Sequence, residues 1–134
     1  MVNNPGVGTS AIIVNDNGEI LMGLRRGNLG NNTWGFPGGK LNYGEEIIDC
    51  IVREVKEETN LDVSNLNYIC TTNDIMEEDN KHYITMFFST KDYKGDLKVV
   101  ELDKCLEWKW FNPKELPSNL FKPVVNFING NVIT

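Results

Sequence analysis

The clearest periodic pattern in the chain lies between positions 45 and 59. Apolar residues recur there at the spacing of one helix face, and they are Ile47, Ile48, Ile51, Val52 and Val55. At about 100° per residue they cover an arc of roughly 140°, which predicts an amphipathic helix that packs on the core. The same helical wheel places Cys50 on the polar flank.

Runs of alternating or strongly apolar residues predict strands on both sides of this helix. The expected strands cover 6–15, 19–25, a short run around Trp34, 67–73, 82–90, 97–100 and 107–111. The turn at 16–18 is expected to join the first two as a hairpin, and the very apolar run 82–90 is expected near the sheet centre. A second helix is expected over 123–128, with Ser118 as a candidate cap and Gly130 at its end. The pattern predicts one α/β domain over 1–134, with a mixed β-sheet between the first helix and the short C-terminal helix.

Three glutamates stand out on the first helix. Glu58 falls inside the apolar arc, Glu54 lies just outside its edge, and Glu57 lies one step further round. Spacings of three and four residues allow the three carboxylates to converge, although like charges repel and desolvation is costly. A solvated face neutralised by Arg53 and Lys56 would explain many such runs. The position of these acids on the apolar side instead favours a bound cation, and hard oxygen ligands favour Mg²⁺ or Mn²⁺.

The segment in front of the helix contains Gly38, Gly39 and Gly44. Glycine permits positive φ and a close approach of the backbone to a ligand. A tight glycine loop beside a helix that carries carboxylates suits a metal-bound phosphate chain.

Net charge, cysteine content and the lack of long apolar runs limit the kinds of protein that this sequence can encode. The net charge of −6 argues against binding to a nucleic-acid backbone, because no basic excess is available to neutralise phosphates. The three cysteines show no C-x-x-C spacing, which favours a reduced, cytoplasmic protein. The N-terminal residues lack the basic and apolar parts of a signal peptide, and no apolar run is long enough to span a membrane.

The run from Gly39 to Leu61 resembles the Nudix box, G-x5-E-x7-R-E-U-x-E-E-x-G-U, in which U is aliphatic. Asn60 stands where the family has glycine. That position follows the expected helix end, where left-handed backbone is common and Asn is the usual substitute for Gly. The resemblance extends beyond the box: FPGGKLNYGE, which overlaps its start, HYITMF and CLEWKWF are similar to segments of MutT-like nucleotide diphosphatases, nearest to the eukaryotic and plant nucleotide-sanitising branch.

The resemblance implies a Nudix α/β/α sandwich that hydrolyses nucleoside triphosphates, including oxidised ones such as 8-oxo-dGTP, to monophosphate and pyrophosphate by metal-activated water. It implies a Mg²⁺ cofactor, with Mn²⁺ as a substitute. The implied metal ligands are the Gly38 carbonyl, Glu54 and Glu58, with Glu57 sharing the cluster; Glu57 and Glu58 also belong to the implied catalytic set. Arg53 is expected to pair with a helix acid and fix its rotamer.

Six further positions complete the implied site. An acid from a distant loop often completes such sites, and Asp103 is the first candidate by its spacing to Trp108, with Glu101 as the second. Arg25 is either a solvated residue or a clamp on phosphate oxygens. Gly39, Lys40, Thr85 and Phe121 are the other expected substrate contacts, with Phe121 stacking on a base. Thr85 and Phe121 fit equally well as core residues.

Other functions stay open. The markers of family members that act on ADP-ribose, dinucleoside polyphosphates or NADH are absent, and Glu77 stands where ADP-ribose enzymes have proline. ADP-ribose or an isoprenyl diphosphate is the alternative substrate, and a nucleotide-binding module without hydrolysis is a third possibility. A homodimer is suggested by relatives and by the exposed-looking Trp108, Trp110 and Phe111.

Overall fold

A four-stranded sheet, here called the central sheet, runs through the molecule in a computed structural model that describes residues 4–133. Its strand order is β4 (Gly38–Lys40), β1 (Gly6–Ile13), β7 (Lys81–Thr90) and β6 (Asn67–Met76). Strands β1 and β7 are parallel, whereas β4 and β6 pair antiparallel with their neighbours. The predicted mixed sheet is therefore confirmed, as is the interior position of β7.

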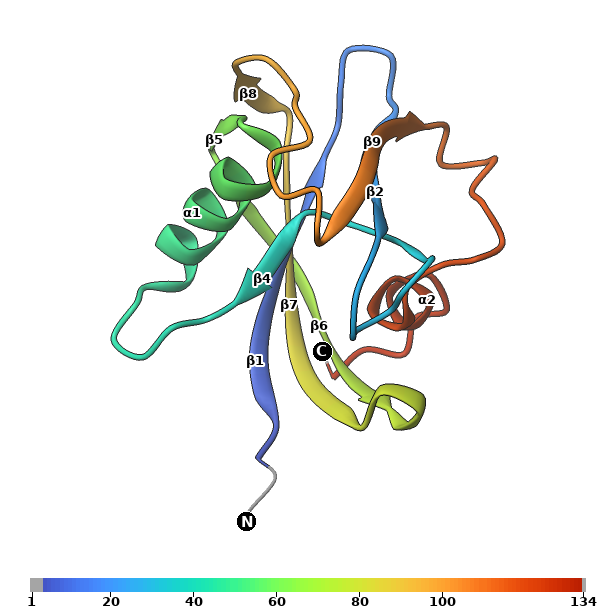
Figure 1. The fold of residues 1–134 in the computed structure, drawn as a ribbon. Helices are drawn as coiled ribbons and strands as arrows, with labels where there is room; N and C mark the ends of the chain where they lie inside the picture. Colours follow the sequence, from blue (N-terminus) through green and yellow to red (C-terminus); the bar gives the residue numbers. More distant parts are fainter. Residues whose placement is uncertain (1–3, 134) are drawn as a thin grey trace.

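A second sheet lies beside the central one (Figure 1). Its strand order is β3 (Trp34–Gly35), β2 (Ile20–Arg25) and β9 (Cys105–Phe111). Strands β5 (Asp62–Ser64), directly after the first helix in the chain, and β8 (Asp92–Lys94) form a two-stranded antiparallel ribbon. The short helix η1 (Glu77–Asp79) joins β6 to β7.

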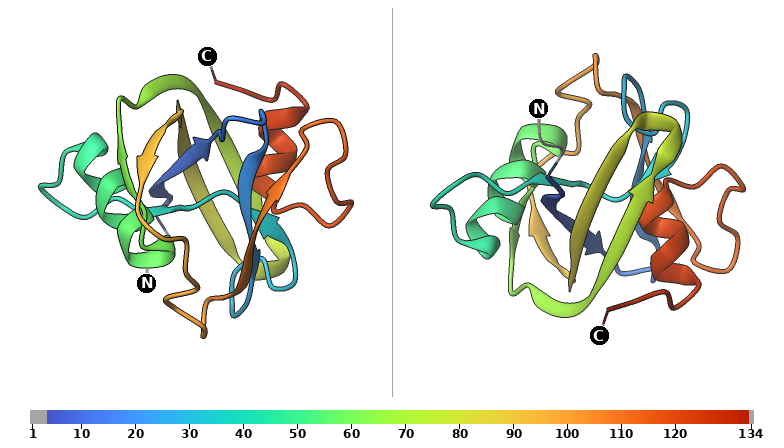
Figure 2. Two further views of the ribbon diagram at one scale, coloured as in Figure 1. Left: turned by 90° about the horizontal axis from the view of Figure 1, so that it is seen from above. Right: turned by 90° about the horizontal axis from the view of Figure 1, so that it is seen from below.

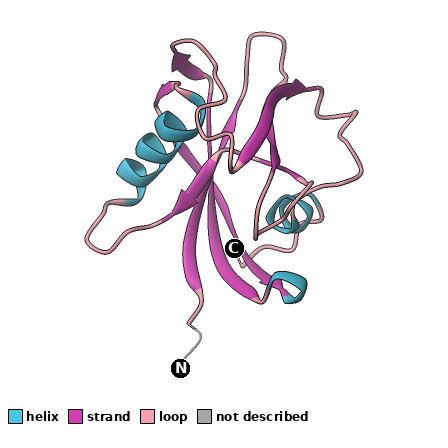
Figure 3. Ribbon diagram, viewed as in Figure 1, coloured by secondary structure: helices cyan, strands magenta, loops and turns pink. Residues whose placement is uncertain are grey.

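The helices α1 (Ile47–Thr59) and α2 (Lys122–Ile128) lie on opposite sides of the sheets (Figures 2 and 3). Alternation along β1 explains the layers, because successive strand side chains point to opposite faces. Ala11 and Ile13 share one core cluster with Ile51 of α1, whereas Ile12 shares a second cluster with Val124 of α2. The predicted α/β/α sandwich is confirmed, with one apolar cluster on the α1 side and a second on the α2 side.

Helix α1 follows the predicted pattern at its centre and end. Ile51 and Val55 are fully buried, and Asn60 beyond the last turn has φ 68°, the left-handed conformation expected there. Two details were wrong. Ile48 is 43% exposed, whereas Ile47 beside it packs against the core, so the buried arc of the helix is narrower than predicted. Cys50 is fully buried, since its thiol points at the carbonyls of β4.

Three other predicted features differ from the structure. The expected hairpin is reduced to a bridge between Val14 and Ile20, because β1 and β2 diverge into separate sheets. Residues 97–100 form no strand, although Lys98 donates its backbone N–H to Thr59. Ser118 does not cap α2, whose N-cap is Phe121. The helix itself is present, one residue longer than predicted at its start.

The aromatic residues of β9 face inward. Phe111 is buried, and Trp108 and Trp110 pack partly buried against the α1 core. The expectation that these rings are exposed was wrong, so they give no support for a homodimer. No helix within 4–133 is long and apolar enough to cross a membrane. Residues 1–3 and 134, part of the expected domain, lie outside the described residues.

Candidate active site

The glycine loop meets α1 at a contact between Gly38 and Glu58. The Gly38 N–H donates a 2.9 Å hydrogen bond to Glu58 Oε1. Gly38 has φ +154°, and a Cβ atom there would overlap the carbonyl oxygen of Thr9. Only glycine fits this position, so the loop backbone lies directly against the carboxylate.

Gly39 makes a second close approach, to Glu54. A Cβ atom on Gly39 would collide with the Glu54 carboxyl group, and the Gly39 carbonyl accepts a 3.2 Å hydrogen bond from Thr9 Oγ1. Glycine at this position therefore makes room for a carboxylate of the helix. The Thr9 contact fixes the loop against β1.

Arg53 ties the helix to the loop. Its Nε and Nη2 donate to the two carboxylate oxygens of Glu45 at 2.7 and 3.0 Å, a bidentate pair. Its Nη1 donates to Glu54 Oε1 at 2.8 Å and reaches Glu57 at 3.3 Å. The predicted pairing of Arg53 with a helix acid is present. The Arg53 hydrogen bonds lower the pKa of Glu45 to about 2.

Burial sets the electrostatics of the two inward-facing glutamates. Desolvation raises the pKa of Glu58 to about 8, the Gly38 N–H opposes this shift, and the charge of Glu54 adds to it. Desolvation also raises the pKa of Glu54, and Arg53 opposes that shift. Two carboxylates in a site that disfavours their charge form a good environment for a cation.

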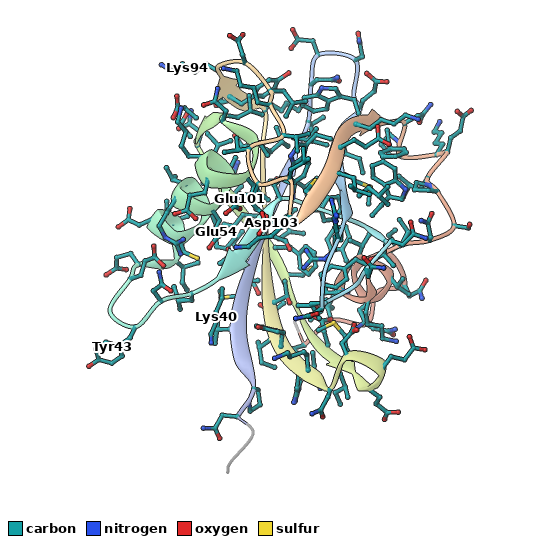
Figure 4. All side chains as sticks on the ribbon, viewed as in Figure 1. Lys40, Tyr43, Glu54, Lys94, Glu101 and Asp103 are labelled. Carbon is teal, nitrogen blue, oxygen red and sulfur yellow. The ribbon has the colours of Figure 1, made fainter. Side chains whose placement is uncertain are left out.

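These residues line a pocket of about 410 Å³ between the two sheets and α1. Most of the predicted site residues contribute to it, namely Arg25, Gly38, Gly39, Lys40, Glu54, Glu58, Thr85 and Phe121. Figure 4 shows Glu54 of α1 and Glu101 of the loop before β9 close together near the centre of the molecule, with Lys40 of β4 nearby. Residues from six separate parts of the chain thus meet at one site.

Arg25 is the inward-facing residue of the Arg25–Arg26 pair. Its guanidinium lies 4.0 Å from the ring centroid of Phe121, and its Nε donates to the carbonyl of Leu29 at 3.1 Å. Burial lowers the pKa of Arg25, while the charge of Glu58 opposes the shift. Because the guanidinium covers one face of Phe121, that face is not available to stack on a base.

Besides Arg53, two predicted site residues, Glu57 and Asp103, do not line the pocket. Glu57 is exposed and does not line the pocket, although its carboxylate and that of Glu54 both accept hydrogen bonds from Arg53 Nη1. Asp103 is exposed and does not line the pocket. Glu101, the second candidate, lines the pocket, and its charge raises the pKa values of Glu54 and Glu58. Of the two candidates, the structure places Glu101 in the pocket lining, and the functional role of either acid stays a prediction.

The residues present fit a divalent cation with two carboxylates. Within residues 4–133 no three acidic, cysteine or histidine side chains are gathered closely enough to form a ready-made metal site. Glu54 and Glu58 nevertheless place desolvated carboxylate oxygens beside the Gly38–Gly39 backbone, a hard-oxygen donor set. Glu54, Glu58 and a loop carbonyl are the residues that would hold such an ion.

Sequence reasoning missed several lining residues. Tyr83 lies two positions before Thr85 on β7, so strand alternation could have placed both on one face. Met76 and Lys104 carry no such signal, because each reaches the pocket from the end of an element or from a loop whose path the sequence does not define.

A family profile described as NUDIX domain matches residues 4–129. The chain belongs to the NUDIX family. The ADP-ribose pyrophosphatase of Methanocaldococcus jannaschii is 32% identical over 120 residues, which cover 88% of this chain and 68% of that protein. Nudix hydrolase 2 of Arabidopsis thaliana is 45% identical over 58 residues, 42% of this chain, and the match covers 21% of the plant protein.

Solved NUDIX structures share the fold. The MutT NUDIX hydrolase from Burkholderia pseudomallei superposes with a TM-score of 0.87 at 27% identity, covering 98% of this chain and 100% of that chain. The MutT protein from Methanosarcina mazei Go1 gives a TM-score of 0.83 at 24% identity, with 97% and 94% covered. NUDIX relatives are named as pyrophosphatases and hydrolases, which confirms the expected enzyme class.

Proposed function

We propose that this NUDIX enzyme hydrolyses nucleoside triphosphates to nucleoside monophosphate and pyrophosphate with Mg²⁺, or with Mn²⁺ as a substitute. The observation that carries the proposal is a single pocket with three chemically distinct parts. The lining contains acidic, cationic, and aromatic or hydroxyl side chains, which we assign to an acidic end, a cationic flank and a nucleoside end. A nucleoside triphosphate has parts that match all three.

The acidic end is formed by Glu54, Glu58 and Glu101. A divalent cation bound there supplies positive charge to the phosphate oxygens and lowers the pKa of water. Glu54 is held in place by Arg53, and Glu58 by the Gly38 N–H. These two contacts keep the carboxylates oriented before any ligand enters. Glu101 lies on the loop before β9, where its Oε2 is 3.6 Å from Lys104 Nζ, and we assign it the role of proton acceptor.

The cationic flank is formed by Arg25, Arg26, Lys40 and Lys104. Phe121 and the Leu29 carbonyl fix the direction of the Arg25 guanidinium. A planar guanidinium held in this way binds phosphate oxygens at a defined position, whereas lysines act as mobile point charges. Arg25 therefore positions the phosphate chain next to the acidic end.

The nucleoside end contains Phe36, Met76, Tyr83, Thr85 and Phe121. The volume of about 410 Å³ lies within the range of small-molecule sites. Apolar and aromatic surface suits a base, and the Thr85 hydroxyl suits a polar edge. This composition also accommodates an oxidised base such as that of 8-oxo-dGTP.

A second candidate substrate is ADP-ribose. The observation in its favour is the 32% identity to the archaeal ADP-ribose pyrophosphatase over 88% of this chain. ADP-ribose carries the same diphosphate but ends in a second ribose in place of a terminal phosphate. The cationic flank favours the triphosphate, because each additional phosphate adds negative charge beside four basic residues.

We further infer a small-molecule partner, without nucleic acid, in a reducing, cytoplasmic location. The net charge of −6 disfavours a polyanionic partner such as RNA or DNA. Cys50, Cys70 and Cys105 are free and buried, which suits a reducing compartment.

The test is a substrate panel with Mg²⁺ in which monophosphate and pyrophosphate are both quantified. The panel contains ordinary and oxidised nucleoside triphosphates, ADP-ribose, a dinucleoside polyphosphate and an isoprenyl diphosphate. We expect the highest kcat/KM for a triphosphate. A tenfold or greater preference for ADP-ribose would replace the first substrate by the second, and an absence of turnover on every compound would refute hydrolysis.

A further inference from the structure

A buried carboxylate lies behind the nucleoside end of the pocket, outside the proposed chemistry. Asp74 of β6 is fully buried, and among residues 4–133 no ion pair to it is found. Its partners are three neutral donors. Thr72 Oγ1 and Thr85 Oγ1 donate to its Oδ2 at 2.9 and 2.5 Å, and Asn126 Nδ2 donates to its Oδ1 at 2.8 Å.

The sheet register builds this network. Thr72 lies opposite Thr85 in the antiparallel ladder of β6 and β7, and Asp74 lies two residues further along the same face of β6. Asn126 reaches that face from α2, which packs on β6. Four buried polar side chains from three elements therefore satisfy one another, as buried polar groups require.

Of the four side chains, Thr85 alone is in contact with the pocket. A threonine hydroxyl has one proton to donate and two lone pairs that can accept. Because the proton of Thr85 is committed to Asp74, the hydroxyl can only accept a hydrogen bond from a ligand. Thr9, which also lines the pocket, donates in the same way to the carbonyl of Gly39.

We propose that Asp74 is a positioning residue that makes the Thr85 wall of the pocket an acceptor, and that this wall selects bases carrying an exocyclic amino group. The inference rests on the proposed function, since it assigns the base end of the same site. It concerns binding of the base and leaves the hydrolytic step unchanged.

An isosteric change reverses the polarity of this wall. In Asp74→Asn, the side-chain carbonyl can still accept from Asn126, which turns the new NH₂ group toward Thr72 and Thr85. The Thr85 hydroxyl then accepts from that NH₂ and has its own proton free for the pocket. The variant should lose the preference for an amino group without losing the pocket.

The probes are two pairs of nucleoside monophosphates that differ only by an amino group: GMP with IMP, and AMP with purine riboside monophosphate. Their equilibrium binding to the full chain is measured calorimetrically with Mg²⁺. For at least one pair we expect the wild type to bind the amino member about three- to tenfold more tightly, the effect of one hydrogen bond. The preference should disappear in Thr85→Val, persist in Thr85→Ser, and vanish or reverse in Asp74→Asn.

Thr72→Val is the matched control, because it removes a donor from the same Asp74 oxygen at a position that does not line the pocket. It should lower the melting temperature and keep the base preference.

If Asp74→Asn does not fold, the comparison of Thr85→Val with Thr85→Ser decides the question. Equal binding within both pairs, or a preference that survives Thr85→Val, would overturn the inference. Binding is measured without turnover, so an inactive enzyme that still discriminates would refute the proposed function alone.

Discussion

The backbone N–H of Gly38 donates a 2.9 Å hydrogen bond to Glu58 Oε1, across 20 residues of sequence. This contact joins the glycine loop to the far end of the carboxylate helix, where Trp108 Nε1 also donates to the Glu58 carbonyl at 3.1 Å. Glu58 is thus fixed at both its side chain and its backbone. A carboxylate held rigidly in a desolvated pocket is suited to bind a cation without further rearrangement.

The raised pKa of Glu58 makes the stability of the metal-free protein depend on pH. The folded-state pKa is about 8, against 4.5 in the unfolded chain. The favourable contribution to the free energy of unfolding is therefore complete below pH 4.5 and is lost as the pH rises toward 8. Relative to Glu58→Gln, which cannot ionise, the wild type should lose at least about 1–2 kcal/mol between pH 5 and pH 8.

Urea unfolding of both proteins in a chelator, at several pH values, measures this difference. Saturating Mg²⁺ should reduce it, since a cation bound to the folded state stabilises the ionised carboxylate. Parallel pH profiles for the wild type and Glu58→Gln would show that Glu58 is not desolvated as described.

Gly39→Ala should separate activity from stability. The new Cβ atom would displace the Glu54 carboxyl group, which is the mobile end of a side chain, so unfolding should change by less than about 1 kcal/mol. Affinity for Mg²⁺ should fall at least tenfold, as read by calorimetry. Gly44→Ala is the matched control: it has open space but φ +79°, so it should cost about 1 kcal/mol of stability with little loss of turnover. Equal metal affinity in Gly39→Ala and the wild type would contradict the proposed ligand role of Glu54.

Glu101 and Asp103 form a natural pair for testing the acid contributed by the distant loop. Glu101 lines the pocket and Asp103 is exposed, although only two positions separate them. Glu101→Gln should lower kcat at least tenfold, whereas Asp103→Asn should stay within twofold of the wild type. Steady-state kinetics on the best triphosphate provides the comparison. The reverse order of effects would restore Asp103 as the functional residue.

Asn60 permits a test of the one departure from the box pattern. Its φ of 68° costs a residue with a Cβ atom about 1–2 kcal/mol, less for Asn, and its Nδ2 donates to the Asp96 carbonyl at 3.0 Å. Asn60→Ala should destabilise the protein by about 1 kcal/mol or more. Asn60→Gly should be nearly neutral, because relief of the backbone offsets the lost hydrogen bond. Chemical denaturation distinguishes the two, and a large loss in Asn60→Gly would show that the side-chain contact dominates.

The sequence predicted correctly those features of the fold that depend on a periodic pattern or on the backbone preference of a single residue. The buried positions Ile51 and Val55, the left-handed Asn60 and the central place of β7 all follow from periodicity or local backbone chemistry. Local rules were sufficient for these features. The expected approach of Gly38 and Gly39 to a ligand stays a prediction, and the structure places both glycines against helix carboxylates.

The remaining features depend on contacts between distant segments. A helical wheel places Glu57 beside Glu54, but it does not show that Arg53 binds both carboxylates or that only Glu54 lines the pocket. The choice between Glu101 and Asp103 depends on the path of a loop with no regular structure. The hairpin prediction failed because β1 and β2 join different sheets, which turn residues alone do not reveal.

The most direct test of the proposed function is the stoichiometry of products from the best nucleoside triphosphate, with the wild type and Glu58→Gln assayed side by side in Mg²⁺. The wild type should release nucleoside monophosphate and pyrophosphate in equal amounts, and both should stop when the metal is chelated. Glu58→Gln should be folded and at least about 100-fold slower. Release of single phosphate from the triphosphate, or undiminished turnover by Glu58→Gln, would contradict the assignment of the pocket.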